Sequence, residues 1–454
     1  MFRDAVAVAR YFGLEYLWID SLCIVQDDDM DWQRESVRMK DVYGCSTFNI
    51  SASGAQDGSV GCFFDRDAPA MRKISRSRVP LLHKGRQLSI DIAPSQIYRS
   101  FASSPLLGRA WCFQERFISP HTLHFNDTQL FWECQENYAC ETFPDGSPQP
   151  HRRDLLRCGL ATTKASSVTD PHSSGLIHSI VEDSEGLDTP LASESPSISG
   201  GIDTTRSLSE LWSECVRIYS RTKLTRQTDK LIALAGVASW VHQRSSDQYL
   251  AGLWRENLET QLLRHAVTTG RDRTAQDNYH LARPVEYLAP SWSWASTNRQ
   301  IHYTTAYDPA TVPNPNLTYS CLIVVINAET DPVTPGDAFG RVKGGRLRIE
   351  FPEMRTGYVG LSNRSRERVY LDDPGGQIHG IEVFYLAVLR CCETSNCGGG
   401  MCFEEGIVLR EVSWEAATFR RIGYYVLDGC GSTIGANVDG RRFNSWNARC
   451  LTLI

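Results

Sequence analysis

Residues 16–39 read YLWIDSLCIVQDDDMDWQRESVRM, and this stretch decides the expected fold. Its first four residues form a continuous apolar run, which is typical of a strand buried on both faces. The acidic turn that follows offers N-caps for a helix expected from about Trp32 to Tyr43. The next segment, STFNISAS (46–53), has the composition of a strand. Strand, helix and strand in this order predict a parallel βαβ arrangement and hence an α/β sheet.

The helix after the acidic turn directs one carboxylate towards the body of the domain. At about 100° per residue, Glu35 flanks the apolar stripe that begins at Trp32. A partly buried carboxylate can act as a general acid, a general base or a stabiliser of positive charge. Alternatively, Glu35 is a structural ion-pair partner of Arg34, Arg38 or Arg109. The sequence leaves both interpretations open.

Two further candidate groups follow the first expected strand. Asp20 ends the apolar run, and the crevice outside the carboxyl ends of parallel strands is the usual ligand site. Asp20 could therefore face Glu35 across that crevice, or it could cap the turn that follows. Cys23 has Leu22 and Ile24 as sequence neighbours, and these favour an inert core thiol.

A second candidate region is GRAWCFQER (108–116), which is expected to turn into a helix. It contains Arg109, Trp111, Gln114 and Glu115. Trp111 and Gln114 are three residues apart and share a helix face, and Glu115 follows directly. These side chains could bind a flat polar ligand, or they could form a hydrogen-bond network between helices.

Length and charge restrict the class of protein. The chain has 454 residues, which is too long for one ordinary core and predicts two or three structural units. A net charge of -6 without a dense Lys/Arg stripe lacks the footprint of a nucleic-acid-binding protein. No apolar run approaches the roughly 18 residues of a membrane span, and the first residues lack the features of a signal peptide. We therefore expect a cytoplasmic protein that binds no nucleic acid and has no membrane span.

The cysteines and the short motifs limit which metal, phosphate-binding and catalytic sites are expected. The fifteen cysteines are odd in number and scattered, which fits reduced, mostly buried thiols. In CCETSNCGGGMC (391–402) the CxxC spacing of a zinc knuckle is absent, so we expect a hairpin with free thiols and no metal. GxGxxG, GxxxxGK(S/T), HExxH and GxSxG are also absent, which argues against a phosphate loop, a metalloprotease and a serine hydrolase. We expect no bound cofactor.

Composition divides the chain into four parts. Residues 1–141 carry the α/β pattern, and 142–206 form a linker in which 162–206 are rich in Ser, Thr, Asp, Pro and Gly. That stretch cannot bury enough apolar surface to offset the entropy of ordering, so we expect it to be disordered. Helical spacing follows in 207–300 and ends in APSWSWAS (289–296). The remainder, 301–454, consists of β-like apolar segments.

Two dense blocks resemble the fungal heterokaryon-incompatibility (HET) domain. YLWIDSLCIVQDDDMDWQRESVRMKDVYGCSTFNISASGA (16–55) resembles its central block, and LLGRAWCFQERFISPHTLHFNDTQLFWEC (106–134) resembles its closing block. SRTKLTRQTDKLIALAGVA, YLAGLW and APSWSWAS resemble segments that commonly follow this domain. The resemblance covers about residues 1–141 as the domain and, more loosely, 207–296.

This resemblance implies fungal non-self recognition and programmed cell death when incompatible strains fuse. It implies partners among other HET or incompatibility proteins, or a homo-oligomer. The HET domain is distantly similar to the TIR domain, a flavodoxin-like parallel sheet flanked by helices. Some TIR domains cleave NAD with one glutamate on a helix after a buried strand, and Glu35 occupies that position here. NAD would then be a substrate rather than a cofactor; alternatively, the domain is a non-catalytic interaction module.

HET domains usually begin with an upstream strand that ends in a pattern like SYVWG. In this sequence Met1 already lies in the first expected helix, so we expect that strand to be missing. In a TIR-like sheet it would be central and would line the ligand site. We therefore expect a truncated or inactive product with little activity.

Overall fold

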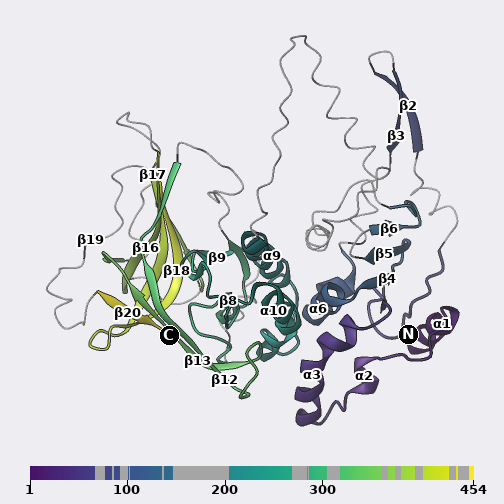
Figure 1. Cartoon of the computed structure of the whole chain (residues 1–454), viewed down its shortest axis with the longest axis horizontal. Helices are drawn as coiled ribbons and strands as arrows, with labels where there is room; N and C mark the ends of the chain where they lie inside the picture. The colour runs from purple at the N-terminus through teal and green to yellow at the C-terminus, as the bar shows by residue number, and fades with distance from the viewer. Residues whose placement is uncertain are drawn as a thin grey trace.

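The computed structural model arranges the chain as three successive parts (Figure 1). An α/β part comes first, helices follow from Thr204, and strands dominate the C-terminal half. The stretch that we expect to be disordered lies outside the described residues, except for 204–206, which begin a helix. The structure describes residues 1–66, 77–83, 86–92, 101, 103–134, 138–146, 204–267, 284, 286–303, 317–358, 367–373, 380–393, 402–428, 436–437 and 449–454.

The helix α3 (Asp29–Gly44) follows the acidic turn, as predicted. Asp28 is its N-cap, and the Asp28 carboxylate accepts hydrogen bonds from the backbone N–H groups of Met30 and Asp31 at 2.8 and 3.2 Å. These bonds satisfy N–H groups that a helix leaves open at its start. The other helices of the N-terminal part are α1 (Phe2–Tyr11), α2 (Asp20–Cys23), η1 (Pro105–Gly108) and α6 (Ala110–Ile118).

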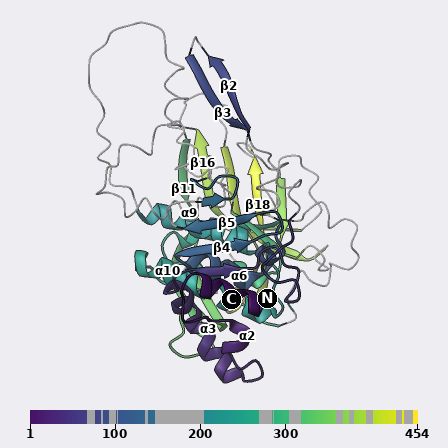
Figure 2. The same ribbon diagram turned by 90° about the vertical axis from the view of Figure 1, so that its right-hand side faces the viewer.

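The N-terminal sheet is small and mixed. Its strand order is β1-β4-β5-β6, and only β1 and β4 run parallel. The prediction of an α/β part is confirmed, but a parallel, flavodoxin-like sheet is wrong, because short connections after β4 and β5 turn the chain straight back. The strands are β1 (Asn49–Ser51), β4 (His121–Phe125), β5 (Leu130–Cys134) and β6 (Tyr138–Cys140); a separate hairpin, β2 (Ser77–His83) and β3 (Arg86–Ile92), projects from this part (Figure 1, Figure 2).

The prediction of a buried strand at YLWI is also wrong. Residues 16–19 have no regular structure, Tyr16 is 89% exposed, and α2 begins at Asp20. The backbone is extended at Ile19, with φ −135° and ψ 122°, yet no strand in the described part of the chain pairs with this run. An extended segment becomes a strand only where a neighbour takes its backbone hydrogen bonds, and apolar composition does not reveal that neighbour.

Of the helical segment predicted for 207–300, the part up to Ser245 is confirmed, but the remainder is wrong, because the described residues there form short strands and one four-residue α-helix. The helix α10 (Ile232–Ser245) is buried along most of its length and packs against α3, α6 and α9 (Thr204–Tyr219). Across the described residues, no helix is long and apolar enough to cross a membrane. The shorter elements of this part are η3 (Gln227–Asp229), β7 (Tyr249–Leu250), β8 (Leu253–Trp254), α11 (Leu258–Gln261), β9 (Arg264–Val267), η6 (Trp294–Ser296) and β10 (Gln300–Tyr303).

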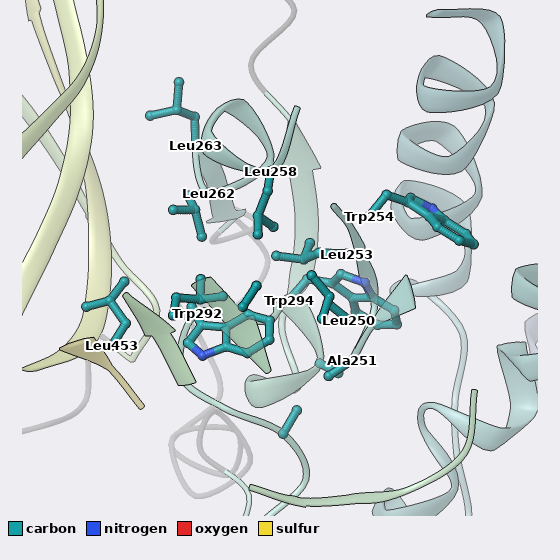
Figure 3. Close-up of a cluster of buried hydrophobic side chains, with 14 of the residues drawn as sticks. Leu250, Ala251, Leu253, Trp254, Leu258, Leu262, Leu263, Trp292, Trp294 and Leu453 are labelled. Atoms are coloured by element: carbon teal, nitrogen blue, oxygen red, sulfur yellow. The ribbon is translucent and has the colours of Figure 1, made fainter. Parts of the chain in front are cut away.

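The segment APSWSWAS (289–296) lies within the largest hydrophobic core. Figure 3 shows Trp292 and Trp294 among buried leucines. The Nε1 atoms of Trp294 and Trp212 both donate to the carbonyl oxygen of Gly252, at 2.7 and 2.9 Å. Gly252 has φ +101°, and a Cβ there would lie 2.5 Å from Trp294 Nε1, so the turn requires glycine.

A ten-stranded sheet forms the C-terminal part, as the β-like segments predict. Its main path is β12-β13-β20-β18-β17-β16-β14-β19, with β11 beside β16 and β15 beside β18. The strands are β11 (Leu317–Cys321), β12 (Val324–Pro332), β13 (Val342–Glu350), β14 (Arg355–Tyr358), β15 (Glu367–Leu371), β16 (Glu382–Glu393), β17 (Cys402–Ser413), β18 (Thr418–Asp428), β19 (Ala436–Asn437) and β20 (Cys450–Leu453).

Candidate functional site

A cleft with a volume of about 760 Å³ lies in the N-terminal part. One wall is the segment 14–20, and another is the face of α3 that runs from Trp32 to Tyr43. Residues of α1, β1 and α6 also line the cleft. Of the site residues predicted from the sequence, the cleft brings together Asp20, Arg109, Trp111 and Glu115.

Glu115 has a pKa raised to about 7. Burial is the main cause and the negative charge of Asp20 adds to it, whereas Arg109 lowers the pKa. The side chains of Tyr43 and Cys112 hydrogen-bond to the Glu115 carboxyl and also lower its pKa. Burial raises the pKa of the Tyr43 hydroxyl and of the Cys112 thiol well above their usual values, so both are protonated donors at neutral pH.

Asp20 and Arg109 are exposed at this cleft, where a ligand from solvent can reach them. Asp20 Oδ1 accepts a hydrogen bond from the backbone N–H of Ser21 at 2.7 Å, but Asp20 is the first residue of α2, and no side-chain hydrogen bond caps that helix. The charge of Asp20 also acts on Glu115. A carboxyl group with a pKa of about 7, close to a second carboxylate, can accept or release a proton during a reaction near neutral pH.

Glu35 lies on α3 outside the cleft lining. Its Oε1 accepts hydrogen bonds from Arg38 Nη1 at 2.9 Å and from Arg34 Nε at 3.2 Å. Both arginine side chains are largely exposed, at 63% and 66%. This geometry matches the alternative that Glu35 is a structural ion-pair partner, and its partners are Arg34 and Arg38 rather than Arg109. Asp20 therefore acts on Glu115 and not on Glu35. A catalytic role of Glu35 stays a prediction.

Residues 1–115 match the family described as heterokaryon incompatibility protein (HET). The chain contains a HET domain. This domain implies a role in heterokaryon incompatibility, and the matched residues include all of the cleft residues named above, from Asp20 to Glu115. No curated protein and no solved structure matches the chain.

Trp111 and Gln114 play different parts in the HET domain. The Trp111 ring lines the cleft and meets the ring of Trp32 edge to face, with centroids 6.0 Å apart. Gln114 is 1% exposed, and its Oε1 accepts a hydrogen bond from the backbone N–H of Gly236 on α10 at 2.6 Å. Gln114 therefore belongs to the hydrogen-bond network between helices, and Trp111 is available to a ligand.

The sequence did not single out Tyr43 and Cys112 as site residues. Tyr43 lies three helical turns after Trp32 on the stripe that faces the domain, so the helical period could have found it. Cys112 carries no such signal, because its neighbours in the sequence are those of a core residue. The prediction of a core thiol at Cys23 is wrong: α2 is a single turn with no buried residue, and Cys23 is exposed.

No group of three or more His, Cys, Asp or Glu side chains in the described ranges could hold a metal ion. In the cysteine-rich segment, Cys391 is buried and Cys392 is partly buried. Cys397 and the side chain of Cys402 lie outside the described residues.

Proposed function

We propose that this protein acts in heterokaryon incompatibility as an effector of regulated cell death, and that its HET domain hydrolyses the nicotinamide–ribose bond of NAD. The resemblance of HET domains to TIR domains suggests the reaction. The observation that carries it is Glu115, whose pKa of about 7 suits proton transfer at neutral pH and which shares the cleft with Asp20. The cleft volume of about 760 Å³ falls within the usual range for a small-molecule site.

The proposed chemistry uses the two carboxylates in different roles. The bond between ribose C1 and the nicotinamide nitrogen breaks, and its electron pair leaves with nicotinamide, which becomes neutral. The Asp20 carboxylate stabilises the positive charge that develops on the ribose. Water attacks C1, and its proton passes to ionised Glu115. Arg109 binds the phosphates, and Trp111 offers a ring face to a base.

The experiment measures nicotinamide released from NAD by the purified full chain and by two glutamine variants. Glu115→Gln should lower the rate by about 100-fold or more, because the amide cannot accept the proton. Glu35→Gln is the matched control and should keep the rate. Activity should rise with pH through about 7, where Glu115 becomes ionised, and this rise should be absent in Glu115→Gln.

The outcomes separate the alternatives. Loss of activity in a folded Glu35→Gln protein, with Glu115→Gln active, would assign the reaction to Glu35. Absence of nicotinamide with the wild-type chain would remove the enzymatic part of the proposal and leave the heterokaryon incompatibility role.

A non-catalytic interaction module is the second candidate, and one observation favours it. The first 40 residues expose many large apolar side chains, including Tyr11 at 85%, Leu22 at 64% and Met30 at 76%. Exposed apolar side chains offer contact area to a protein partner, here another HET protein or a second copy of the chain. Light scattering should then show self-association that Leu22→Ser weakens without loss of fold.

A further inference from the structure

A second cleft, with a volume of about 850 Å³, lies in the C-terminal half. Its lining comes from residue 284, from the segment 286–297 and from parts of β13, β17 and β18. Four exposed basic side chains line it: Lys343, Arg346, Arg410 and Arg420. It shares no lining residue with the HET-domain cleft, so what it binds is independent of the function proposed above.

Three of these side chains form a row across neighbouring strands. Arg410 on β17 is directly opposite Arg420 on β18. The register of β13 and β18 with β20 places Arg346 and Arg420 on either side of Ile454. Because neighbouring strands lie about 4.8 Å apart, the row extends for about 14 Å along the sheet.

The three arginines point away from the core. Each has a fully buried neighbour in its strand, namely Leu347, Leu409 and Phe419. Since side chains alternate between the two faces of a strand, the arginines project from the outer face and into the cleft that covers it.

Much of this positive charge has no partner within the described residues. Lys343, Arg346 and Arg410 make no ion pair or side-chain hydrogen bond with any of those residues, although Glu329 lies directly opposite Arg346 on β12. Arg410 and Arg420 are directly opposite each other on neighbouring strands, and like charges in this position repel each other.

The base of the cleft adds to the positive charge. Arg421 is 2% exposed and contacts the carboxylate of Asp372. The fully buried Arg264 also approaches Asp372, with Nη1 and Oδ1 3.4 Å apart. Two buried cations therefore share one carboxylate, and buried charges of one sign are stabilised by an anion nearby.

The cleft is not uniformly basic. Glu286, Asp331 and Asp373 also line it, and Tyr287 exposes 52% of its surface there. Carboxylates accept hydrogen bonds from hydroxyl groups, and a tyrosine ring packs against a planar or apolar group. A ligand that matches this lining has an elongated anionic part and a neutral part that carries hydroxyl groups.

We propose that this cleft binds a small molecule with two or more linked phosphate groups, with the phosphates along the row of Arg346, Arg420 and Arg410. Arginine is well suited to phosphate, because its planar guanidinium donates two parallel hydrogen bonds. The length of the row selects linked phosphates over a single phosphate, and the carboxylates bind hydroxyl groups of the remainder.

Calorimetric titration of the full chain with inorganic tripolyphosphate, and with orthophosphate at the same ionic strength, tests this proposal. Tripolyphosphate should bind at least about tenfold more tightly than orthophosphate. Arg346→Gln and Arg410→Gln should each weaken tripolyphosphate binding by about tenfold. Arg348→Gln is the matched control, because Arg348 is exposed on the same face of β13 but outside the cleft, and it should change the affinity less than about twofold.

The melting temperature without anion provides a second measurement. Arg410→Gln removes the like-charge pair, so its melting temperature should equal or exceed that of the wild type. Weaker binding by this variant then reports a lost contact rather than a lost fold. Equal affinity for the two anions, or an equal loss in Arg348→Gln, would overturn the proposal, because either result is typical of nonspecific charge attraction.

Discussion

At the scale of single residues, Glu115 and Lys230 both have a pKa of about 7, and burial is the main cause for each. Burial disfavours the charged form, so it raises the pKa of an acid and lowers that of a base. Glu115 lines a cleft, whereas Lys230 is 5% exposed, donates to the carbonyl of Thr297 and lies 5.7 Å from the centroid of Trp294. Only Glu115 is in a position to meet a substrate, and Lys230 acts on stability.

Lys230 should make the stability of the protein depend on pH. Its folded pKa of about 7 lies below the usual 10.5, so the unfolded chain binds more protons between these values. Stability should therefore rise with pH above about 7, and the cost of the buried charge should be fully present at lower pH. Lys230→Met should raise the free energy of unfolding at pH 6 by on the order of 1–3 kcal/mol, less whatever the lost bond to Thr297 costs.

Urea denaturation from pH 6 to pH 9 measures this effect. Lys343→Met, at an exposed lysine of the same chain, is the control, and its free energy of unfolding should change with pH as that of the wild type does. If the free energy of unfolding of Lys230→Met changed with pH as it does in the wild type, Lys230 would not be the group responsible.

At the scale of elements, the sequence predicts what local chemistry determines. The cap of α3 could be predicted because Asp28 and its N–H donors are adjacent in the chain. The conformation of YLWI (16–19) could not be predicted, because an apolar run forms a strand only beside a neighbouring strand, and the run itself does not specify that neighbour. The same limit applies to the site: Asp20 and Glu115 could each be identified, but their meeting depends on packing between segments 95 residues apart in the sequence.

Because YLWI is not a buried strand, a substitution at Trp18 should have only a small effect on stability. In a buried strand, Trp18→Ala would cost about 3–5 kcal/mol. In the structure Trp18 is only partly buried, lines the cleft and meets Tyr43 edge to face at 5.7 Å. Trp18→Ala should therefore cost about 1 kcal/mol and leave the domain folded. Trp212→Ala, at a fully buried ring, is the comparison and should cost about 3–5 kcal/mol in the same denaturation experiment.

At the scale of the whole molecule, the HET domain is joined to the parts that follow it through α6 and α3. The backbone of Lys223 pairs with Gly108 and Ala110 on either side of Arg109, with N···O distances of 2.7 and 3.0 Å. Arg341 in the C-terminal half bonds Asp229 at 2.8 Å and lies 5.6 Å from the ring centroid of Trp32. The walls of the HET-domain cleft therefore contact residues far beyond the matched family segment. The geometry of this cleft depends on the docking of the HET domain against the parts of the chain that follow it.

Gly236 is the point at which this docking is most sensitive to added volume. A Cβ at Gly236 would lie 2.5 Å from Ile118 Cδ1 and 2.9 Å from Gln114 Oε1, both on α6. Gly236→Ala would gain about 1 kcal/mol of helix propensity in α10, but overpacking costs about 1–3 kcal/mol and strains the bond from Gly236 N to Gln114. The cost of overpacking should exceed the gain in helix propensity, because the Gln114 side chain cannot move without losing its hydrogen bond to Gly236 N.

We expect Gly236→Ala to loosen the HET domain from α10 rather than unfold α10 itself. Hydrogen exchange should therefore increase in α6 and at residues 108–110 while the amides of α10 stay protected. Gly58→Ala, where a Cβ would meet no atom within 4 Å, is the control and should exchange like the wild type. If Gly236→Ala stabilised the chain with unchanged exchange in α6, then α6 must yield easily, and the cleft would not depend on its contact with α10.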